Sequence, residues 1–428
     1  MAELLTAPYQ GLPELIITPA QFSTMLEQLA AGSGPIAVDA ERASGFRYSA
    51  RAYLIQIKRR DGGLHLIDPI PFGPGHELFA QLNHLWRDEE IILHASTQDL
   101  PCLRELGLNP TKLFDTELAG RLIGAPRVGL GTLVESLLDI GLAKEHSAQD
   151  WSVRPLPEDW LNYAALDVEL LIELRDEIEK ILIEKEKLQW AMQEFAAILA
   201  APPSEKRVDP WRRTSGMHKV KKRNQLAVVK FLWESRDDLA AHLDISPGRV
   251  LSDLAISTVA LASENSPITN KRELEKVLRP IGLRARWFEN TPRWLKAIES
   301  ALALPEEECP PTRTKSDALP PIKLWRERFP EKYIPLSHAR HQITLKAEEL
   351  DLPVENLLTP ELLRQICWRL PNSDQVAPLL RQMGARQWQI DYAAPILVAA
   401  LAEEEPLVEE EAVELAHDEA GVPLESGE

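Results

Sequence analysis

The chain has 428 residues, of which 27% are charged, and a formal net charge of −18 at pH 7. Domains of about 100 to 200 residues predict two or three folded units for a chain of this length. It has no run of about 18 apolar residues and no signal-peptide pattern, so we expect a soluble cytoplasmic protein rather than a membrane-spanning or secreted one. The cysteines, Cys102, Cys309 and Cys367, form no CxxC pair, which argues against a zinc finger and fits a reducing compartment.

The negative charge is distributed unevenly along the chain. Residues 1–205 carry 17 basic and 31 acidic side chains, whereas residues 206–300 carry 19 basic and 11 acidic ones. Residues 301–402 are nearly neutral, and residues 403–428 contain 11 acidic and no basic side chains. A local basic segment attracts phosphates whatever the total charge, so the net charge does not exclude a nucleic-acid partner.

The N-terminal third alternates predicted strands and helices. Helical spacing is present in HELFAQLNHLW, residues 76–86, and Thr97 is the predicted N-cap of a helix that ends near Gly107. Beyond that helix the pattern is mostly helical, so we expect an α/β domain over residues 1–203 with a mixed sheet. Short apolar runs bounded by turn residues predict strands over residues 35–41, 52–58, 64–70 and 90–96.

The remainder of the chain reads as two helical blocks with linkers. Residues 204–216 lack any apolar period and predict a linker before the helical block 217–300. A second, proline-rich linker over residues 301–320 precedes the helical block 321–402. The acidic tail, residues 403–428, has no aromatic residue, and we expect it to be disordered.

Two carboxylates lie at the end of the first long predicted strand. Side chains alternate along a strand, so Asp39 and Glu41 share one face and are about 7 Å apart. Like charges held together cost free energy unless a cation neutralises them, and oxygen ligands suit Mg²⁺ or Mn²⁺. Taken alone, an Asp-x-Glu pair is more often a pair of solvated surface carboxylates.

Two further acidic residues strengthen the metal hypothesis. Asp99 lies in the first turn of the helix after a predicted buried strand, where it can reach the same edge of the sheet. Asp167 interrupts an apolar helical face, and Tyr163 lies four residues earlier on that face. By itself the Tyr163–Asp167 pair fits a hydrogen-bonded core pair equally well.

The order Asp-x-Glu, Asp, Tyr-x-x-x-Asp resembles the DEDD 3′-5′ exonucleases. It is similar to the branch with tyrosine in the third motif, because the histidine of the other branch is replaced here by Asn162. The fuller resemblance is to the ribonuclease D family, and it covers nearly everything except the acidic tail. It rests on AVDAE, YLIQI followed by LIDP, HASTQDL, LFDTELAGRLIG and DWSVRPLPEDWLNYAALDV.

The resemblance implies a fold and a reaction. The fold is a ribonuclease H-like mixed sheet flanked by helices, followed by two all-α domains. The reaction is removal of nucleoside 5′-monophosphates from the 3′ end of RNA, with tRNA precursors or other structured RNA as expected substrates. Apart from the resemblance, we expect a monomer, because one catalytic and two helical domains can close a ring without a second chain. Two divalent ions would be held by Asp39, Glu41, Asp99 and Asp167, and Tyr163 would orient the attacking water and help to take its proton.

The basic helical block resembles an HRDC domain, a helical module shared by helicases and ribonuclease D. The matching run is WESRDDLAAHLDISPGRVLSD within residues 217–300. Residues 321–402 are expected to form a second, divergent HRDC-like domain that serves as a spacer or clamp and completes a ring over the active site. Expected nucleic-acid contacts in the basic block are Lys219, Lys221, Lys222 and Arg223.

The chain departs from the family pattern at Arg42, where relatives usually have an aromatic or apolar residue. HASTQDL also has Ser96 and Gln98 where relatives tend to have other small or acidic residues. Neither departure removes a metal ligand. We expect Arg42 to contact a substrate phosphate or, as the plainer reading, to form a surface salt bridge.

Four residues near the motifs have competing interpretations. Asp115 is predicted to be a helix N-cap rather than a metal ligand. We expect His94 to be packed and hydrogen-bonded rather than catalytic, and Trp151 to pack the loop that contains it. For Arg154 we favour a phosphate contact over packing.

Two alternatives to the exoribonuclease reading remain open. The catalytic motifs do not distinguish RNA from DNA, because contacts to the 2′-hydroxyl cannot be recognised in a sequence. A catalytically inactive nucleic-acid-binding protein would retain the fold but lack a metal ligand, and here all four carboxylates and Tyr163 are present.

Overall fold

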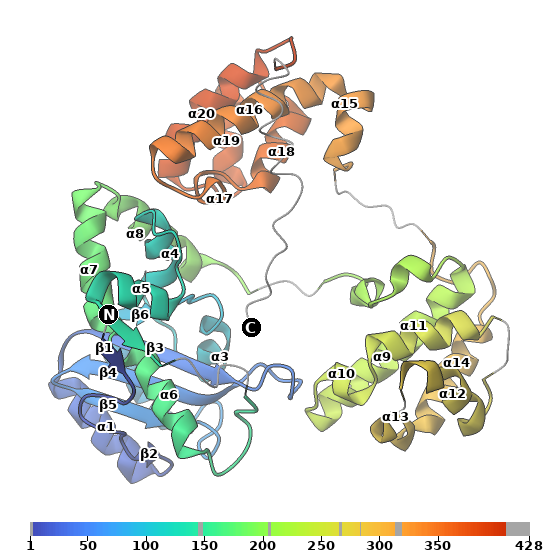
Figure 1. Ribbon diagram of the computed structural model, residues 1–428, viewed down its shortest axis with the longest axis horizontal. Coiled ribbons are helices and arrows are strands. Elements are labelled where there is room, and N and C mark those ends of the chain that lie inside the picture. The colour runs from blue at the N-terminus through green and yellow to red at the C-terminus, as the bar shows by residue number, and fades with distance from the viewer. Residues whose placement is uncertain are drawn as a thin grey trace.

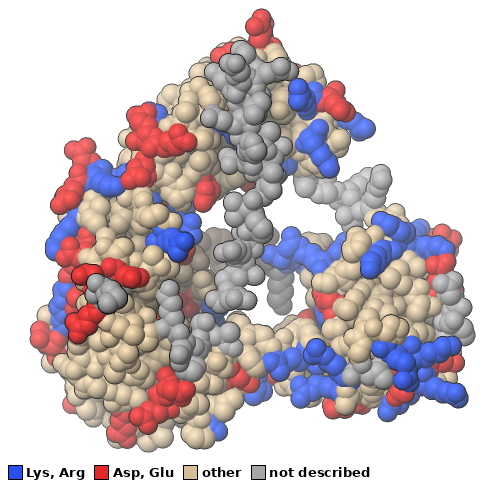
Figure 2. All heavy atoms as spheres, viewed as in Figure 1, with Lys and Arg blue, Asp and Glu red and all other residues tan. Residues whose placement is uncertain are grey.

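The computed structural model describes residues 3–143, 149–203, 207–264, 268–282, 284–312 and 319–407. Most of the predicted disordered tail, residues 403–428, lies outside this part of the chain. Figure 1 shows an N-terminal α/β domain, a middle helical domain and a C-terminal helical domain. In the space-filling view the three domains surround an opening (Figure 2). In the described ranges no helix is long and apolar enough to cross a membrane.

The N-terminal domain is built on a mixed sheet, as predicted, and this sheet has six strands. The order across the main sheet is β2 (Leu15–Ile16), β5 (Gly63–Ile67), β4 (Ala52–Arg60), β3 (Ser33–Arg42), β6 (Glu90–Leu93) and β7 (Lys112–Asp115). Strand β4 pairs antiparallel with β3 and β5, whereas β2 pairs parallel with β5, and β6 pairs parallel with β3 and β7. A small sheet is formed by β1 (Glu3–Leu5) and β8 (Ile140–Leu142).

Helices cover both faces of this sheet. Val38 of β3 belongs to a large cluster with residues of α1 (Pro19–Ala31), α2 (Glu77–Trp86) and α7 (Leu171–Glu184). Leu54 of β4 belongs to a smaller cluster with residues of α6 (Glu158–Glu169). Because Val38 and Asp39 point to opposite faces of β3, the side chain of Asp39 lies on the α6 face.

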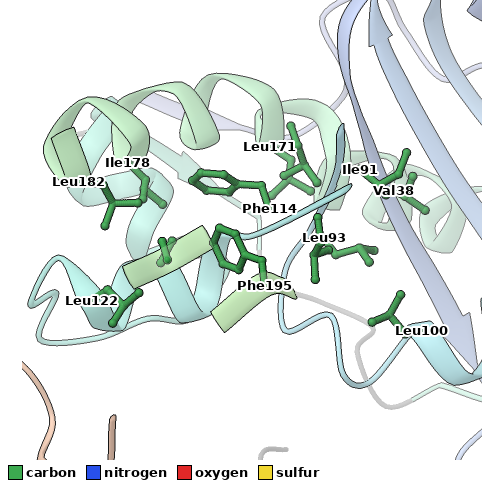
Figure 3. Packing of buried hydrophobic residues seen from close by; sticks show 14 of the residues in the cluster. Val38, Ile91, Leu93, Leu100, Phe114, Leu122, Leu171, Ile178, Leu182 and Phe195 are labelled. Atoms are coloured by element: carbon green, nitrogen blue, oxygen red, sulfur yellow. The ribbon is translucent and has the colours of Figure 1, made fainter. Parts of the chain in front are cut away.

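The large cluster continues beyond the sheet to helices that follow β7. Figure 3 shows Val38 and Ile91 close to Leu171 of α7, and Phe114 close to Phe195 of α8. The rings of Phe114 and Phe195 have centroids 5.1 Å apart. The helices on this side are α4 (Thr116–Leu122), α5 (Leu130–Leu138), α7 and α8 (Leu188–Ala200).

The helix after β6 begins later than predicted. Its N-cap is Asp99 rather than Thr97, and α3 spans Leu100–Glu105. The preceding residues form a turn in which the amide of Gln98 donates to the carbonyl of Ala95 at 3.0 Å. Pro101 lies in the first turn of α3, where a proline is compatible with the missing hydrogen bond. The later start places Asp99, and not Thr97, at the helix terminus.

The middle helical domain has a hydrophobic core of its own. Trp294 is buried in this core, and its Nε1 donates to the carbonyl of Trp287 at 2.7 Å. The domain contacts the N-terminal domain through the loop between β3 and β4, where the amide of Ser246 donates to the carbonyl of Phe46 at 3.0 Å. Its helices are α9 (Arg223–Leu243), α10 (Pro247–Val250), α11 (Asp253–Ala262), α12 (Lys271–Leu278), α13 (Ala285–Glu289) and α14 (Thr291–Leu302).

The C-terminal helical domain shares its core with the N-terminal domain. Buried residues of both belong to one continuous cluster, and the rings of Trp190 and Trp388 stack with centroids 4.8 Å apart. The ammonium of Lys187 donates to the carbonyls of Leu122 at 2.7 Å and Leu350 at 2.6 Å. The helices are α15 (Trp325–Arg328), α16 (Pro330–Glu349), α17 (Val354–Leu357), α18 (Pro360–Arg369), α19 (Ser373–Gln382) and α20 (Gln387–Leu401).

Candidate active site

Strand β3 presents two carboxylates on the face that α6 covers. Asp39 pairs in register with Gln56 of β4, and Glu41 pairs with Leu54. Residues opposite each other in antiparallel strands lie on the same face, so these four side chains form one patch. Leu54 packs in the cluster beneath α6, which places the patch under that helix.

Helix α6 supplies the other side of the site. Glu158 and Asp159 occupy its first turn, where acidic side chains interact favourably with the helix dipole. Tyr163 and Asp167 lie one turn apart, and the Tyr163 hydroxyl donates a hydrogen bond to the Asp167 carboxylate. Asp167 points toward β3, because its carboxylate oxygen lies within 4.8 Å of those of Asp39 and Glu41. Burial, and then the charges of these three carboxylates, raise the pKa of Tyr163.

Three carboxylates converge between β3 and α6. Asp39, Glu41 and Asp167 each offer an oxygen, and these oxygens all lie within 4.8 Å of one another. A set made only of carboxylate oxygens suits a hard divalent cation such as Mg²⁺ or Mn²⁺. The donor set and its close spacing therefore fit the metal site predicted from the motifs.

The fourth predicted ligand, Asp99, lies outside that three-carboxylate group. It is buried at the start of α3, and its side chain makes no capping bond to the helix. Its Oδ1 is 3.8 Å from Nε of Arg42, whose Nη2 donates to Oε1 of Gln98 at 3.2 Å. Asp99 is nevertheless close enough to Asp39 for the charge of Asp39 to raise its pKa, after the larger effect of burial.

Burial dominates the electrostatics of the four carboxyl groups. It raises the pKa of Asp39 to about 6 and raises the pKa values of Glu41, Asp99 and Asp167 well above the ordinary range. Repulsion among the carboxylates adds to the rise for the latter three, whereas Arg42 lowers the pKa of Asp39, Glu41 and Asp99. A divalent cation would remove the cause of the repulsion.

The turn before Asp99 is held by hydrogen bonds to the side chain of Asp115. Asp115 caps α4 by accepting from the amides of Glu117 and Leu118 at 3.0 Å, so the predicted N-cap role is confirmed. Its other oxygen accepts from the amide of Ser96 at 2.8 Å. His94 is hydrogen-bonded to Thr116 at 2.9 Å, and its burial lowers its pKa, as expected of a packed rather than a catalytic histidine.

Arg154 does not have the surroundings of a phosphate-binding residue. Its guanidinium pairs with Asp68, with Nε 2.6 Å from Oδ2 and Nη2 2.9 Å from Oδ1. The remaining N–H groups donate to the carbonyls of Tyr53, Trp151 and Val153. All five N–H groups are therefore engaged within the protein, and the expected phosphate contact is withdrawn. Trp151 is buried, as predicted.

The four predicted contacts of the basic block divide into two pairs. Lys219 and Lys221 are exposed. Lys222 pairs with Glu264, and Arg223 donates to the carbonyls of Glu307 and Cys309, where it holds the chain after α14. Nε and Nη2 of Arg223 therefore have a structural role, and its contact with nucleic acid stays a prediction. Figure 2 shows Lys and Arg side chains gathered on the middle helical domain on this face of the molecule.

The roles of two glutamines near the site were not predicted, although Gln98 is noted above as a departure from the family pattern. Gln98 holds Arg42 beside Asp99. Gln56 lies opposite Asp39, is fully buried, and has no hydrogen-bond partner for either side-chain polar atom in the described part of the chain. One feature of the sequence points to Gln56: it is a polar residue inside the otherwise apolar run YLIQI.

Comparison with known proteins agrees with this geometry. Residues 13–183 match the family model described as 3′-5′ exonuclease, and residues 318–401 match the model described as 3′ to 5′ exonuclease C-terminal domain. Ribonuclease D of Zymomonas mobilis is 34% identical over 284 residues, which are 64% of this chain and 69% of the relative.

Solved structures give the same picture. A crystal structure of a protein from Bifidobacterium adolescentis has 38% identity and a TM-score of 0.83, covering 94% of this chain and 100% of that one. Escherichia coli RNase D, an exoribonuclease involved in structured RNA processing, has 22% identity and a TM-score of 0.62, covering 86% and 98%, a likeness of fold. On the sequence relatives, the motifs and the site together, the chain belongs to the ribonuclease D family.

Proposed function

We propose that this protein is a divalent-metal-dependent 3′-5′ exoribonuclease that releases nucleoside 5′-monophosphates. The observation that carries the proposal is the convergence of Asp39, Glu41 and Asp167, with oxygens within 4.8 Å of one another, in a chain of the ribonuclease D family. Asp99 would complete the ligand set from the opposite side. The convergence also argues against an inactive nucleic-acid-binding protein, for which the acidic residues would have no reason to remain together at a cost in repulsion.

Two bound Mg²⁺ or Mn²⁺ ions would supply an activated water and would stabilise the leaving 3′ oxygen. The charge of Asp39 raises the pKa of both Asp167 and Asp99, after the larger effect of burial. Asp39 is therefore close to both of these carboxylates. Burial first, and then the nearby carboxylates, raise the pKa of Tyr163 in the metal-free site. Bound ions would offset the carboxylate charges, and we assign Tyr163 to orienting the attacking water and helping to take its proton.

The middle helical domain is the part that we propose to bind the RNA backbone. Residues 206–300 have eight more basic than acidic side chains, and exposed Lys219 and Lys221 are free to lie along phosphates in this proposal. We keep the HRDC assignment of residues 217–300 and 321–402 as a prediction. Structured precursors such as tRNA with a free 3′ end are the proposed substrates, and a monomer in the cytoplasm is the proposed state, which the three buried free cysteines suit.

The test is degradation of one RNA carrying a label at either end, with Mg²⁺ or Mn²⁺ and with chelator. We expect the 3′ label to appear at once as mononucleotide and the 5′ label to give a descending ladder. Asp167→Asn should abolish both while RNA binding persists. Tyr163→Phe should lower the rate by about 10²- to 10⁴-fold, the range for one group that handles a proton or orients water.

A matched DNA strand belongs in the same experiment. We expect the RNA strand to be shortened faster, because the family relatives are ribonucleases. Equal or faster shortening of DNA would favour the alternative substrate. RNA binding without any metal-dependent shortening would contradict the proposed activity and leave the middle domain as the functional part.

A further inference from the structure

Arg42 supplies a positive charge directly at one of the four carboxylates. It is the last residue of β3 and follows the predicted ligand Glu41. Its Nε is 3.8 Å from Oδ1 of Asp99, and its Nη2 donates to Oε1 of Gln98 at 3.2 Å. The Arg42 side chain is 27% exposed, whereas that of Asp99 is 6% exposed. The guanidinium therefore reaches inward from the rim of the site to a buried acid.

The site is divided by this contact into two unequal halves. Asp39, Glu41 and Asp167 form a group whose oxygens converge. Among the described residues none of the three has an arginine or lysine nitrogen within 4.0 Å of its carboxylate, although the charge of Arg42 still lowers the pKa of Asp39 and Glu41. Asp99 stands outside that group and already has a cationic partner. An ion that binds the first half meets three carboxylates, whereas an ion that binds Asp99 meets a carboxylate whose charge is partly neutralised.

Arg42 and a divalent ion would compete for the charge of Asp99. An oxygen ligand of Mg²⁺ lies about 2.1 Å from the ion, which would bring the ion close to a guanidinium on the same carboxylate. Coulomb repulsion between the two cations would weaken the binding of each in a partly buried site. Arg42 is the one that can move away, because its side chain is partly exposed and has a flexible stem.

We propose that Arg42 is a positioning residue that orders metal loading, by occupying Asp99 until the second divalent ion displaces it. This inference rests on the proposed function, because it assumes that Asp99 is a metal ligand. Displacement frees the guanidinium at the rim of the site. There it can take the phosphate of the 3′-terminal nucleotide, since its planar fork matches phosphate oxygens. Loading of the second ion is thereby linked to capture of the substrate end.

The experiment measures Mn²⁺ binding to the full-length protein without RNA. Two methods monitor it: calorimetry, and the electron paramagnetic resonance signal of free Mn²⁺. The wild type should bind one ion tightly and a second more weakly. Arg42→Ala should tighten the second step by about three- to tenfold, as expected for the loss of one competing charge, and change the first step by less. Gln98→Ala removes the other anchor of Arg42 and should shift the second step in the same direction by less.

A matched control separates direct competition from a general effect of charge. Arg47 lies five residues away and its Nε donates to Oγ of Ser152 at 2.7 Å, so Arg47→Ala removes the same charge without touching Asp99. It should change neither binding step by more than about twofold. A thermal melt of each variant in chelator confirms that it is folded.

The outcomes keep this inference separate from the proposed function. An unchanged second step in Arg42→Ala, equal shifts in Arg42→Ala and Arg47→Ala, or a single bound ion in the wild type and both variants would each overturn the ordering role. Wild-type protein that shortens RNA while showing any of these results retains its activity and loses only the role of Arg42. Ordered binding of two ions without shortening of RNA would sustain the ordering and contradict the exonuclease.

Discussion

The backbone N–H of Ser49 donates a 2.8 Å hydrogen bond to Oδ1 of Asp244, which joins the loop after β3 to the end of α9. The other oxygen of Asp244 lies 3.3 Å from Nη2 of Arg51 and accepts from the Tyr53 hydroxyl at 3.4 Å. Asp244 itself has a left-handed backbone with φ of 48°. One side chain of the middle helical domain thus holds the loop that follows β3, the strand of Asp39 and Glu41.

Replacing Asp244 should loosen the middle domain from the N-terminal domain. Asp244→Ala loses all three bonds and places alanine in the left-handed region, so we expect faster hydrogen exchange at the Ser49 amide and a larger radius of gyration. Asp244→Asn keeps an acceptor and tolerates the backbone, so its change should be smaller. Protection of the Ser49 amide in Asp244→Ala equal to that in the wild type would contradict this account.

Two separate cores predict two unfolding transitions. The N-terminal and C-terminal domains share one cluster, whereas the middle domain has its own. Trp388 donates to Glu194 at 3.0 Å and is buried in the first core, and Trp294 is buried in the second. By calorimetry, Trp388→Ala should lower the free energy of unfolding of the shared core by about 3–5 kcal/mol, and Trp294→Ala should do the same to the other. A single transition displaced by either substitution would refute the division.

The stability of the metal-free protein should fall as the pH rises. Burial raises the pKa values of the four site carboxyls, to about 6 for Asp39, and mutual repulsion adds to the rise for Glu41, Asp99 and Asp167. A raised pKa means that the folded state holds protons that the unfolded state gives up. The stability that this provides is complete below pH of about 4, the ordinary carboxyl value, and is lost as the pH passes through the folded values.

Thermal melts in chelator at pH 5 and pH 8 measure this effect. We expect a lower melting temperature at pH 8, and Mg²⁺ should restore stability more at pH 8 than at pH 5. Asp167→Asn removes one of the repelling charges, so its metal-free stability should depend less on pH. A metal-free protein that is equally stable at both pH values, with Asp167→Asn behaving identically, would show that the carboxyls are not perturbed.

The carboxylate site could be predicted because the patterns that indicate it are local in the sequence. Alternation along a strand places Asp39 and Glu41 on one face, and helical spacing places Tyr163 and Asp167 on another. The motif order then indicates that these faces meet. The position of Asp99 at a helix terminus was also predicted, although the start of that helix was placed at Thr97.

The roles of the arginines could not be obtained in this way. Whether a guanidinium meets a phosphate or a protein carbonyl depends on neighbours that are distant in the chain. Arg154 binds Asp68, 86 residues away, and Arg223 binds Cys309, also 86 residues away. The shared core of the first and third domains was missed for the same reason, because a proline-rich linker suggests independent domains and does not reveal which surfaces pack.

Two buried glutamines allow the contribution of a hydrogen-bonded amide to the free energy of unfolding to be compared with that of an unpartnered one. Gln56 has no partner among the described residues for either side-chain atom. Gln225, buried in the middle domain, accepts from the amides of Lys221 and Lys222 at 3.2 Å and donates to Glu264 at 2.9 Å. An unpartnered buried amide costs free energy, whereas removing a partnered one leaves its neighbours unsatisfied.

Methionine has a similar length without the polar group, so it tests both sites. We expect Gln56→Met to leave the free energy of unfolding of the shared core unchanged or to raise it by up to about 1 kcal/mol. Gln225→Met should lower that of the middle domain by about 1–3 kcal/mol. Both values follow from denaturant titrations of the two transitions. If Gln56→Met were as destabilising as Gln225→Met, Gln56 would have a hydrogen-bond partner in solution, and the amide opposite Asp39 would count among the groups that hold the site together.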